Sequence, residues 1–157
     1  MKRAFTMIEL IFVIVLIGIL ASIAIPKLAA TRADADASMC ELEVTQLTRE
    51  ISNFYTRKGH TSFSSKPVSE MTNIKIIANS PGRLSGIPTD ENVETGIKYK
   101  CDGADIANFI YSYDATILRY GLTLQINDGT TPASFIASET LKKNLNIKDA
   151  NGKYYIF

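Results

Sequence analysis

The sequence has few of the residues on which most enzymes and metal sites depend. Among its 157 residues there is one histidine, there are two cysteines, and there is no tryptophan. His60 stands in a polar segment with no acidic residue beside it, which leaves little for metal-ligand or triad chemistry. No glycine-rich phosphate loop, nucleophile elbow or paired-cysteine zinc motif is present. We therefore expect a protein that is not an enzyme.

The sequence also lacks an excess of charge of either sign. The 17 lysines and arginines are balanced by 16 acidic residues, so the net charge of +1 creates no general attraction for nucleic acid. A local mix of basic and aromatic residues is still a candidate DNA surface: Lys98, Lys100 and Arg119 with Tyr99, Tyr111, Tyr113 and Tyr120. Alternation along strands produces the same mix without DNA, and we favour that explanation.

Apolar residues are concentrated near the beginning of the chain. Residues 5–25 carry a single formal charge, Glu9, and as a helix they would be roughly 32 Å long. This length matches the ~30 Å hydrocarbon core of a bilayer. The run is too long for the core of a cleaved secretory signal, although Lys2 and Arg3 precede it. We predict a membrane-spanning helix, with Glu9 either reaching the lipid headgroups or paired for a functional purpose.

The residues around Glu9 favour a functional purpose. The segment Ala4-Phe5-Thr6-Met7-Ile8-Glu9-Leu10 resembles the processing site of type IV pilins and type II secretion pseudopilins. Gly18 and Pro26 stand where that family has its helix-loosening glycine and proline. The family normally has glycine before the cut, where this chain has another small residue, Ala4.

This resemblance implies how the N-terminus is processed and assembled. A prepilin peptidase would cut between Ala4 and Phe5, and the new Phe5 amine would be methylated. Glu9 would pair with the Phe5 amine of its own or a neighbouring subunit, since a charge pair is tolerated where a lone charge is penalised. Gly18 and Pro26 would let the helix bend or locally melt.

The resemblance and the charges also predict partners and location. Lys2 and Arg3 favour a cytoplasmic N-terminus and a single pass through the inner membrane. We expect residues 1–4 to be a leader peptide, 5–30 the transmembrane and polymerisation helix, and 31–157 a periplasmic globular domain. The expected partners are the lipid bilayer, the prepilin peptidase, the inner-membrane assembly platform, and copies of this and other pilin-like subunits in a filament.

Beyond Pro26, the pattern changes to an amphipathic helix and a set of strands. An apolar stripe predicts that the helix continues to about Lys58: Cys40, Val44, Leu47, Ile51 and Phe54 or Tyr55. Gly59 is a natural stop, and residues 61–94 indicate an irregular connection. Strands are expected at 97–101, 108–113, 117–127 and 153–157, and a helix at 132–145 with Phe135, Ile136, Leu141 and Leu145 inward. This is an α+β, pilin-like fold in which one long helix packs on a small antiparallel sheet.

Two further features leave alternatives open. Cys40 and Cys101 either form a disulfide, worth about 4 kcal/mol by chain entropy, or are separate buried thiols. Asp149 and Asn151, and less so the Asn127-Asp128-Gly129 segment, are weak candidates for a calcium site. The simpler interpretation of both segments is a turn, and we expect no other metal or cofactor.

Three functions fit the sequence to different degrees. The first is a pseudopilin of a type II secretion system, which would drive protein export from the inner membrane. The second is a type IV pilin or a competence pseudopilin in a surface or DNA-uptake filament. The third is a membrane-anchored periplasmic binding protein that does not polymerise, which requires no cleavage before Phe5.

Overall fold

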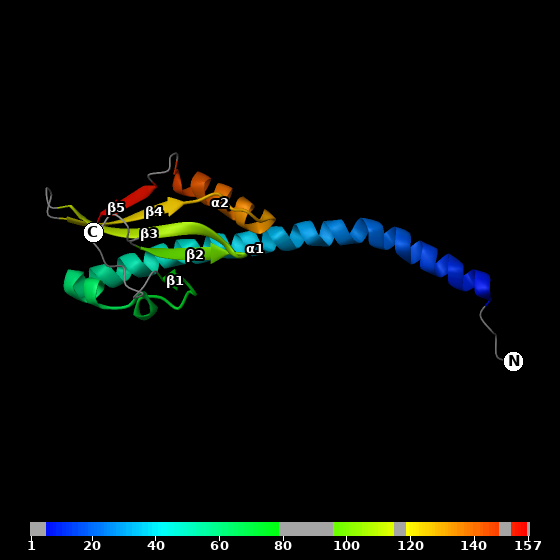
Figure 1. Ribbon diagram of the computed structural model, residues 1–157, viewed down its shortest axis with the longest axis horizontal. Helices are drawn as coiled ribbons and strands as arrows, with labels where there is room; N and C mark the ends of the chain where they lie inside the picture. The colour runs from blue at the N-terminus through cyan, green and yellow to red at the C-terminus, as the bar shows by residue number, and fades with distance from the viewer. Residues whose placement is uncertain (1–5, 79–95, 115–118, 148–151, 157) are drawn as a thin grey trace. The chain divides into compact units, whose positions relative to one another are not determined.

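The computed structural model describes residues 6–78, 96–114, 119–147 and 152–156 (Figure 1). Its contacts divide the chain into a unit ending at Asp34 and a unit beginning at Ala35. The elements in chain order are α1 (Met7–Ser65), the 3-10 helix η1 (Val68–Glu70), β1 (Ile77–Ala78), β2 (Ile97–Cys101), β3 (Ala104–Asp114), β4 (Arg119–Ile126), α2 (Pro132–Leu145) and β5 (Lys153–Ile156). The predicted pilin-like α+β class is confirmed.

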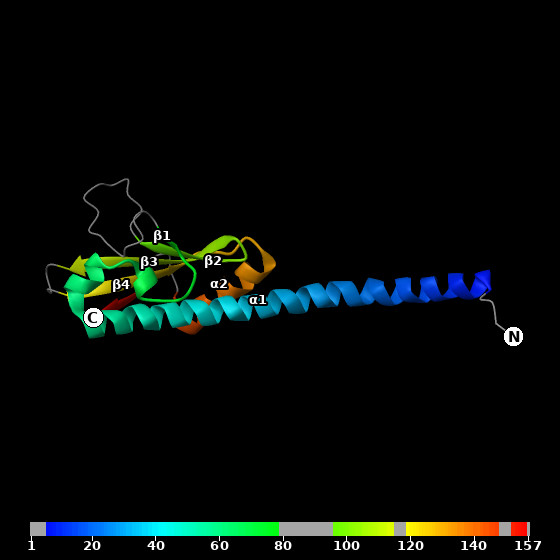
Figure 2. The same cartoon turned by 90° about the horizontal axis from the view of Figure 1, so that it is seen from below.

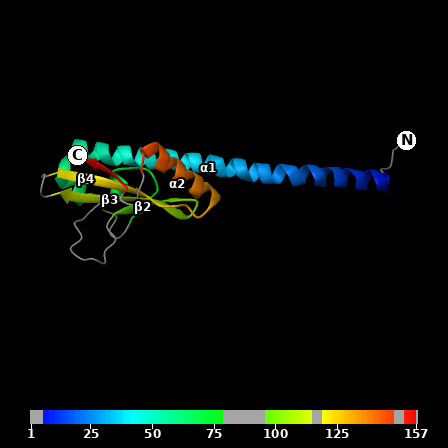
Figure 3. The same ribbon diagram turned by 90° about the horizontal axis from the view of Figure 1, so that it is seen from above.

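Five strands form one antiparallel sheet in the order in which they occur in the chain. The turn between β2 and β3 consists of Asp102 and Gly103, whose φ angles of 48° and 84° are typical of a tight hairpin. The part of α1 that belongs to the second unit runs along one face of this sheet (Figure 2). Helix α2 lies on the same side, beside α1 (Figure 3), where Asn144 donates a hydrogen bond to Glu41.

The apolar stripe predicted on α1 is buried as expected. Val44, Leu47 and Ile51 have no exposed surface, and Cys40 is 8% exposed. They pack in one core with the inward residues of the strands, including Ile97, Tyr99, Phe109, Leu122 and Leu124. Burial of this stripe fixes the second half of α1 to the sheet, because each large apolar side chain contributes about 1.5–3 kcal/mol when it leaves water.

The end of α1 differs from the prediction. Gly59 interrupts the helix with φ 72° and ψ 176°, but helical residues follow as far as Ser65. Phe63 explains the extension, because its side chain is fully buried and its ring lies 5.2 Å from that of Tyr55 and 4.8 Å from that of Tyr111. Glycine at 59 therefore redirects the chain, and the following turn is held by an aromatic contact.

Helix α2 has its predicted bounds, but its predicted inner face is only half right: Leu141 is buried and Leu145 packs partly buried against the core. Phe135 and Ile136 are 53% and 37% exposed, which corrects the expectation that they point inward. Beside Leu141, the inner face is formed by four small residues at helical spacing: Ala133, Ser134, Ala137 and Ser138. Small side chains let the helix approach the sheet closely, and Ser134 also completes a capping box with Thr131 that fixes where the helix begins.

Candidate functional site at the start of the long helix

The helix α1 begins with a reciprocal set of hydrogen bonds between Thr6 and Glu9. The Oε2 atom of Glu9 accepts from the Thr6 backbone N–H at 2.8 Å and from the Thr6 hydroxyl at 2.7 Å. In return, the Thr6 Oγ1 atom accepts from the Glu9 backbone N–H at 3.3 Å. This is a capping box, in which two N–H groups at the helix start are satisfied by side chains.

The capping box changes how Glu9 is understood. A carboxylate within the first helical turn is favoured by the helix dipole, and Thr6 supplies two donors to it within the same turn. Both hydrogen bonds use Oε2, so the capping box leaves Oε1 to another donor. The predicted pairing of Glu9 with the Phe5 amine stays a prediction, because Ala4 and Phe5 lie outside the described residues.

Thr6 is a residue to which the sequence reasoning assigned no role of its own. The signal was present, since Thr-x-x-Glu directly before an apolar run is the sequence pattern of a capping box.

The apolar residues on both sides of Glu9 are uncovered. Leucine, isoleucine, valine, phenylalanine and methionine side chains from Met7 to Leu28 are 42% to 80% exposed. An 18-residue window of this helix has a mean hydropathy of 2.9 and no residue buried by the rest of the described chain. A helix that is apolar on all sides is stable only where lipid or other apolar helices surround it. By length and composition it is able to cross a membrane.

Gly18 and Pro26 lie within this apolar segment. A Cβ atom placed on Gly18 would meet nothing within 4 Å, and Pro26 has no N–H to give to the Ser22 carbonyl four residues earlier. Both positions have helical geometry, since the non-helical dihedral angles within α1 are those of Gly59. Flexibility at Gly18 and Pro26 stays a prediction.

Cys40 and Cys101 form a disulfide in the structure, with their Cα atoms 5.7 Å apart. It connects α1 to the last residue of β2, directly before the Asp102-Gly103 turn. Cys40 is 8% and Cys101 1% exposed, so the bond lies inside the core. Of the two alternatives that the sequence left open, the structure has the bonded one.

The remaining candidate sites receive little support. Asp149 and Asn151 lie outside the described residues, as does the His60 side chain. The Asp128 carboxylate is already paired with the Lys142 ammonium. Within the ranges that the structure describes, no three His, Cys, Asp or Glu residues gather in a way that would hold a metal ion.

The candidate DNA surface is divided between the two faces of the sheet. Tyr99 and Tyr111 are 2% and 6% exposed and belong to the core. Lys98 and Lys100 alternate with Tyr99 along β2 and therefore lie on the opposite face. The mix of basic and aromatic residues arises here from strand alternation, as we favoured. The side chains of Tyr113, Arg119 and Tyr120 are not among those that the structure describes.

Comparison with known protein families finds a match, and it lies at the N-terminal site. Residues 1–25 match the family described as the prokaryotic N-terminal methylation motif. No curated protein and no solved structure matches the chain. The match covers Thr6, Glu9 and Gly18, and it is the signature of type IV pilins and pseudopilins. It implies a substrate of a prepilin peptidase and a subunit that assembles in the manner of pilins.

Proposed function

We propose that the chain is a pseudopilin of a type II secretion system, assembled from the inner membrane through its N-terminal helix to drive protein export. Its work is mechanical, and we assign it no enzymatic activity and no cofactor. The observation that carries the proposal is the start of α1, where Glu9 in a methylation motif precedes an apolar surface that nothing in the described chain covers.

The uncovered helix supports assembly in two stages. Its length and hydropathy suit storage of the subunit in a bilayer, with Lys2 and Arg3 favouring a cytoplasmic N-terminus and a periplasmic globular domain. On leaving the membrane, the same side chains need another apolar cover, and the equivalent helices of neighbouring subunits provide it. Self-association of this segment is therefore expected whenever lipid is withdrawn.

Glu9 would give this association its register. In a low-dielectric environment, a carboxylate without a cationic partner is penalised, so a subunit displaced along the filament loses the pairing with a Phe5 amine. The Thr6 hydroxyl and N–H keep Glu9 satisfied while the subunit is alone. Cleavage between Ala4 and Phe5 is required, because it creates the amine.

The test uses Glu9→Ala with Glu9→Asp as the matched control, since aspartate keeps the charge and shortens the side chain. We expect both variants to insert in membranes, Glu9→Ala to lose filament formation, and Glu9→Asp to retain part of it. Mass spectrometry of the wild-type protein should find a methylated Phe5 as the first residue. Normal filaments from Glu9→Ala, or an intact Met1 in assembled material, would contradict the proposal.

A second experiment separates the secretion assignment from its alternatives. Deletion of the gene should stop export of folded proteins if the chain serves secretion. Loss of DNA uptake or of surface filaments, with export intact, would assign it to a competence or pilus machine. A chain that is not cleaved before Phe5 and stays monomeric in lipid would be a membrane-anchored binding protein.

A further inference from the structure

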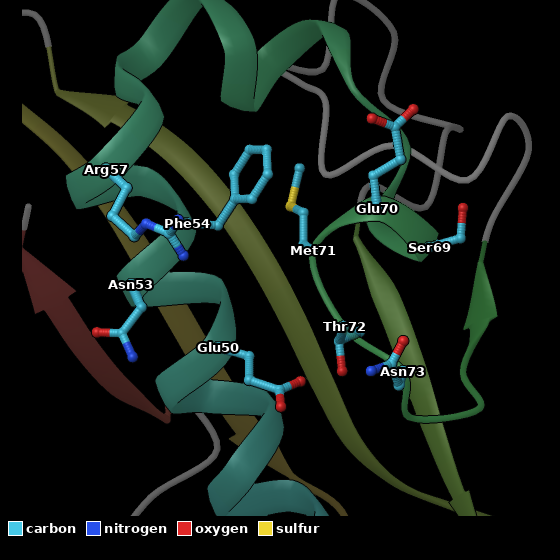
Figure 4. Close-up of a pocket in the computed structure, with 9 residues that line it drawn as sticks. All are labelled: Glu50, Asn53, Phe54, Arg57, Ser69, Glu70, Met71, Thr72 and Asn73. Atoms are coloured by element: carbon cyan, nitrogen blue, oxygen red, sulfur yellow. The ribbon is translucent and has the colours of Figure 1, made fainter.

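A cavity of about 300 Å³ opens between α1 on one side and η1 with the residues that follow it on the other (Figure 4). Glu50, Phe54 and Arg57 line it from α1, and Glu70, Met71 and Thr72 line it from the other side. All of these residues belong to the second unit and are remote in sequence from the N-terminal assembly site. The cavity therefore needs an explanation of its own.

Glu50 provides the strongest feature of this cavity. Its Oε1 atom accepts a 2.8 Å hydrogen bond from the Gln46 side-chain amide. Its Oε2 atom is buried and has no hydrogen-bond partner among the described residues. Figure 4 shows the carboxylate extending from the helix toward Thr72 and Asn73. A buried carboxylate oxygen without a donor is costly, so the Glu50 carboxylate has acceptor capacity that no described residue uses.

The charges around the cavity favour a cation. Two carboxylates, Glu50 and Glu70, and one guanidinium, Arg57, line the cavity. Arg57 lies seven residues along the helix from Glu50 and does not reach the Oε2 atom. Glu70 pairs with Lys66 at 3.1 Å, but both side chains are half-exposed, so this pair contributes little and stays at the rim. The unpaired negative charge is therefore that of Glu50.

The apolar lining adds a second requirement. Phe54 and Met71 both line the cavity, and Figure 4 shows their side chains pointing toward one another. An aromatic ring and a thioether suit an aliphatic chain, and the ring also attracts a cation held near its face. A group that satisfies both the carboxylate and these side chains has a positively charged end on a short aliphatic stem.

From this arrangement, we infer that the cavity is a binding site for a guanidinium or ammonium group on an aliphatic stem, with Glu50 as its charged acceptor. Arginine and lysine carry this chemistry, either as side chains of another polypeptide or as free amino acids. The inference does not depend on filament assembly, and its failure would leave the proposed function unchanged.

Methionine methyl groups provide a direct probe of the site. The sequence has four methionines; Met71 lines the cavity, whereas Met7 and Met39 are 80% and 61% exposed elsewhere on α1. The full chain, labelled at its methionine methyl groups and held in detergent micelles, is titrated with N-acetyl-arginine amide while its NMR spectrum is recorded. The signal that Met71→Leu removes should shift saturably, and those of Met7 and Met39 should not move.

Matched ligands and variants test whether binding requires the positive charge of the ligand and the carboxylate of Glu50. N-acetyl-citrulline amide has the same stem and a neutral end, and should bind at least about tenfold more weakly, as expected when a charge-assisted hydrogen bond is lost. Glu50→Gln can still accept from Gln46 and should weaken arginine binding by a similar factor. Glu139→Gln, an exposed carboxylate on α2, should have no effect. Equal binding of both ligands, or unchanged binding by Glu50→Gln, would overturn the inference.

Two further comparisons identify the source of the cation. Tighter binding of N-acetyl-arginine amide than of free arginine would indicate a side chain of another polypeptide, and the reverse order would indicate a free amino acid. If Arg57 itself occupied the site in solution, the wild-type protein would show no Met71 shift and Arg57→Gln would gain one. That result would replace the external ligand with an internal one and refute the inference.

Discussion

The hydroxyl of Tyr99 on β2 donates a 2.5 Å hydrogen bond to the Oε2 atom of Glu43 on α1. Tyr99 is 2% exposed, so the bond lies where the helix meets the sheet. Burial raises the pKa of the Tyr99 phenol well above its ordinary value, and the hydrogen bond and negative charge of Glu43 raise it further. The folded protein therefore holds this phenolic proton more tightly than the unfolded chain does.

The first prediction concerns stability in alkali. Because the pKa of Tyr99 is higher in the folded state, its contribution is complete below pH 10 and is lost as the pH rises further. Burial also raises the pKa of Tyr155, which acts in the same direction. We expect the free energy of unfolding to fall by up to about 1.4 kcal/mol per pH unit for each such tyrosine. Urea unfolding, followed by tyrosine fluorescence between pH 9 and 11.5, measures this slope.

The control for this prediction is Tyr99→Phe. It should flatten the slope above pH 10, while costing about 1–2 kcal/mol at pH 7, because the Glu43 carboxylate loses its donor. The same slope in wild type and Tyr99→Phe would show that other groups dominate alkaline unfolding.

The second prediction concerns the disulfide. Cys40 and Cys101 are separated by 61 residues, and opening a loop of this length should destabilise the globular unit by about 4 kcal/mol in the chain-entropy model. The measurement is urea unfolding with and without reductant, in the wild type and in a Cys40→Ala, Cys101→Ala double variant. The double variant should match the reduced wild type and should not respond to reductant.

The third prediction concerns the capping box at the start of α1. Thr6→Val keeps the shape of the side chain but removes the hydroxyl that Glu9 uses, and should cost about 1 kcal/mol of local helix stability. Hydrogen exchange of the Glu9 amide in micelles should then become about fivefold faster. Thr6→Ser keeps the hydroxyl and should behave as the wild type. Equal exchange in all three proteins would mean that the capping box does not hold the helix start.

The fourth prediction concerns the inner face of α2. Leu141 is 1% exposed, and Leu141→Ala should destabilise the protein by about 2–5 kcal/mol. Phe135→Ala removes a larger side chain, but because Phe135 is 53% exposed we expect less than about 1 kcal/mol. A larger loss for Phe135 than for Leu141 in urea unfolding would restore the inward orientation that its hydrophobicity had suggested.

The contrast between Leu141 and Phe135 shows that sequence periodicity does not by itself determine which side of a helix is buried. Hydrophobicity favoured Phe135 and Ile136 for the core, and the bounds of α2 were predicted correctly from Pro132 and the turn residues before it. Which side of the helix faces inward depends on how closely it must approach the sheet. Alanine and serine at 133, 134, 137 and 138 permit the close approach, and that requirement exists only once the sheet is present.

Local patterns in the sequence were sufficient to predict the apolar N-terminal helix, its methylation motif and the main elements of the fold. A 21-residue apolar run, the Phe-Thr-x-x-Glu motif and the stripe on α1 depend on residues within a few turns of each other, so helix geometry alone converts them into structure. Other features depend on groups from different elements: the disulfide between Cys40 and Cys101, and the hydrogen bond from Tyr99 to Glu43. The Glu50 oxygen that lacks a hydrogen-bond partner is a third such feature. Tertiary structure decided these, because only packing brings residues that are distant in sequence within bonding distance.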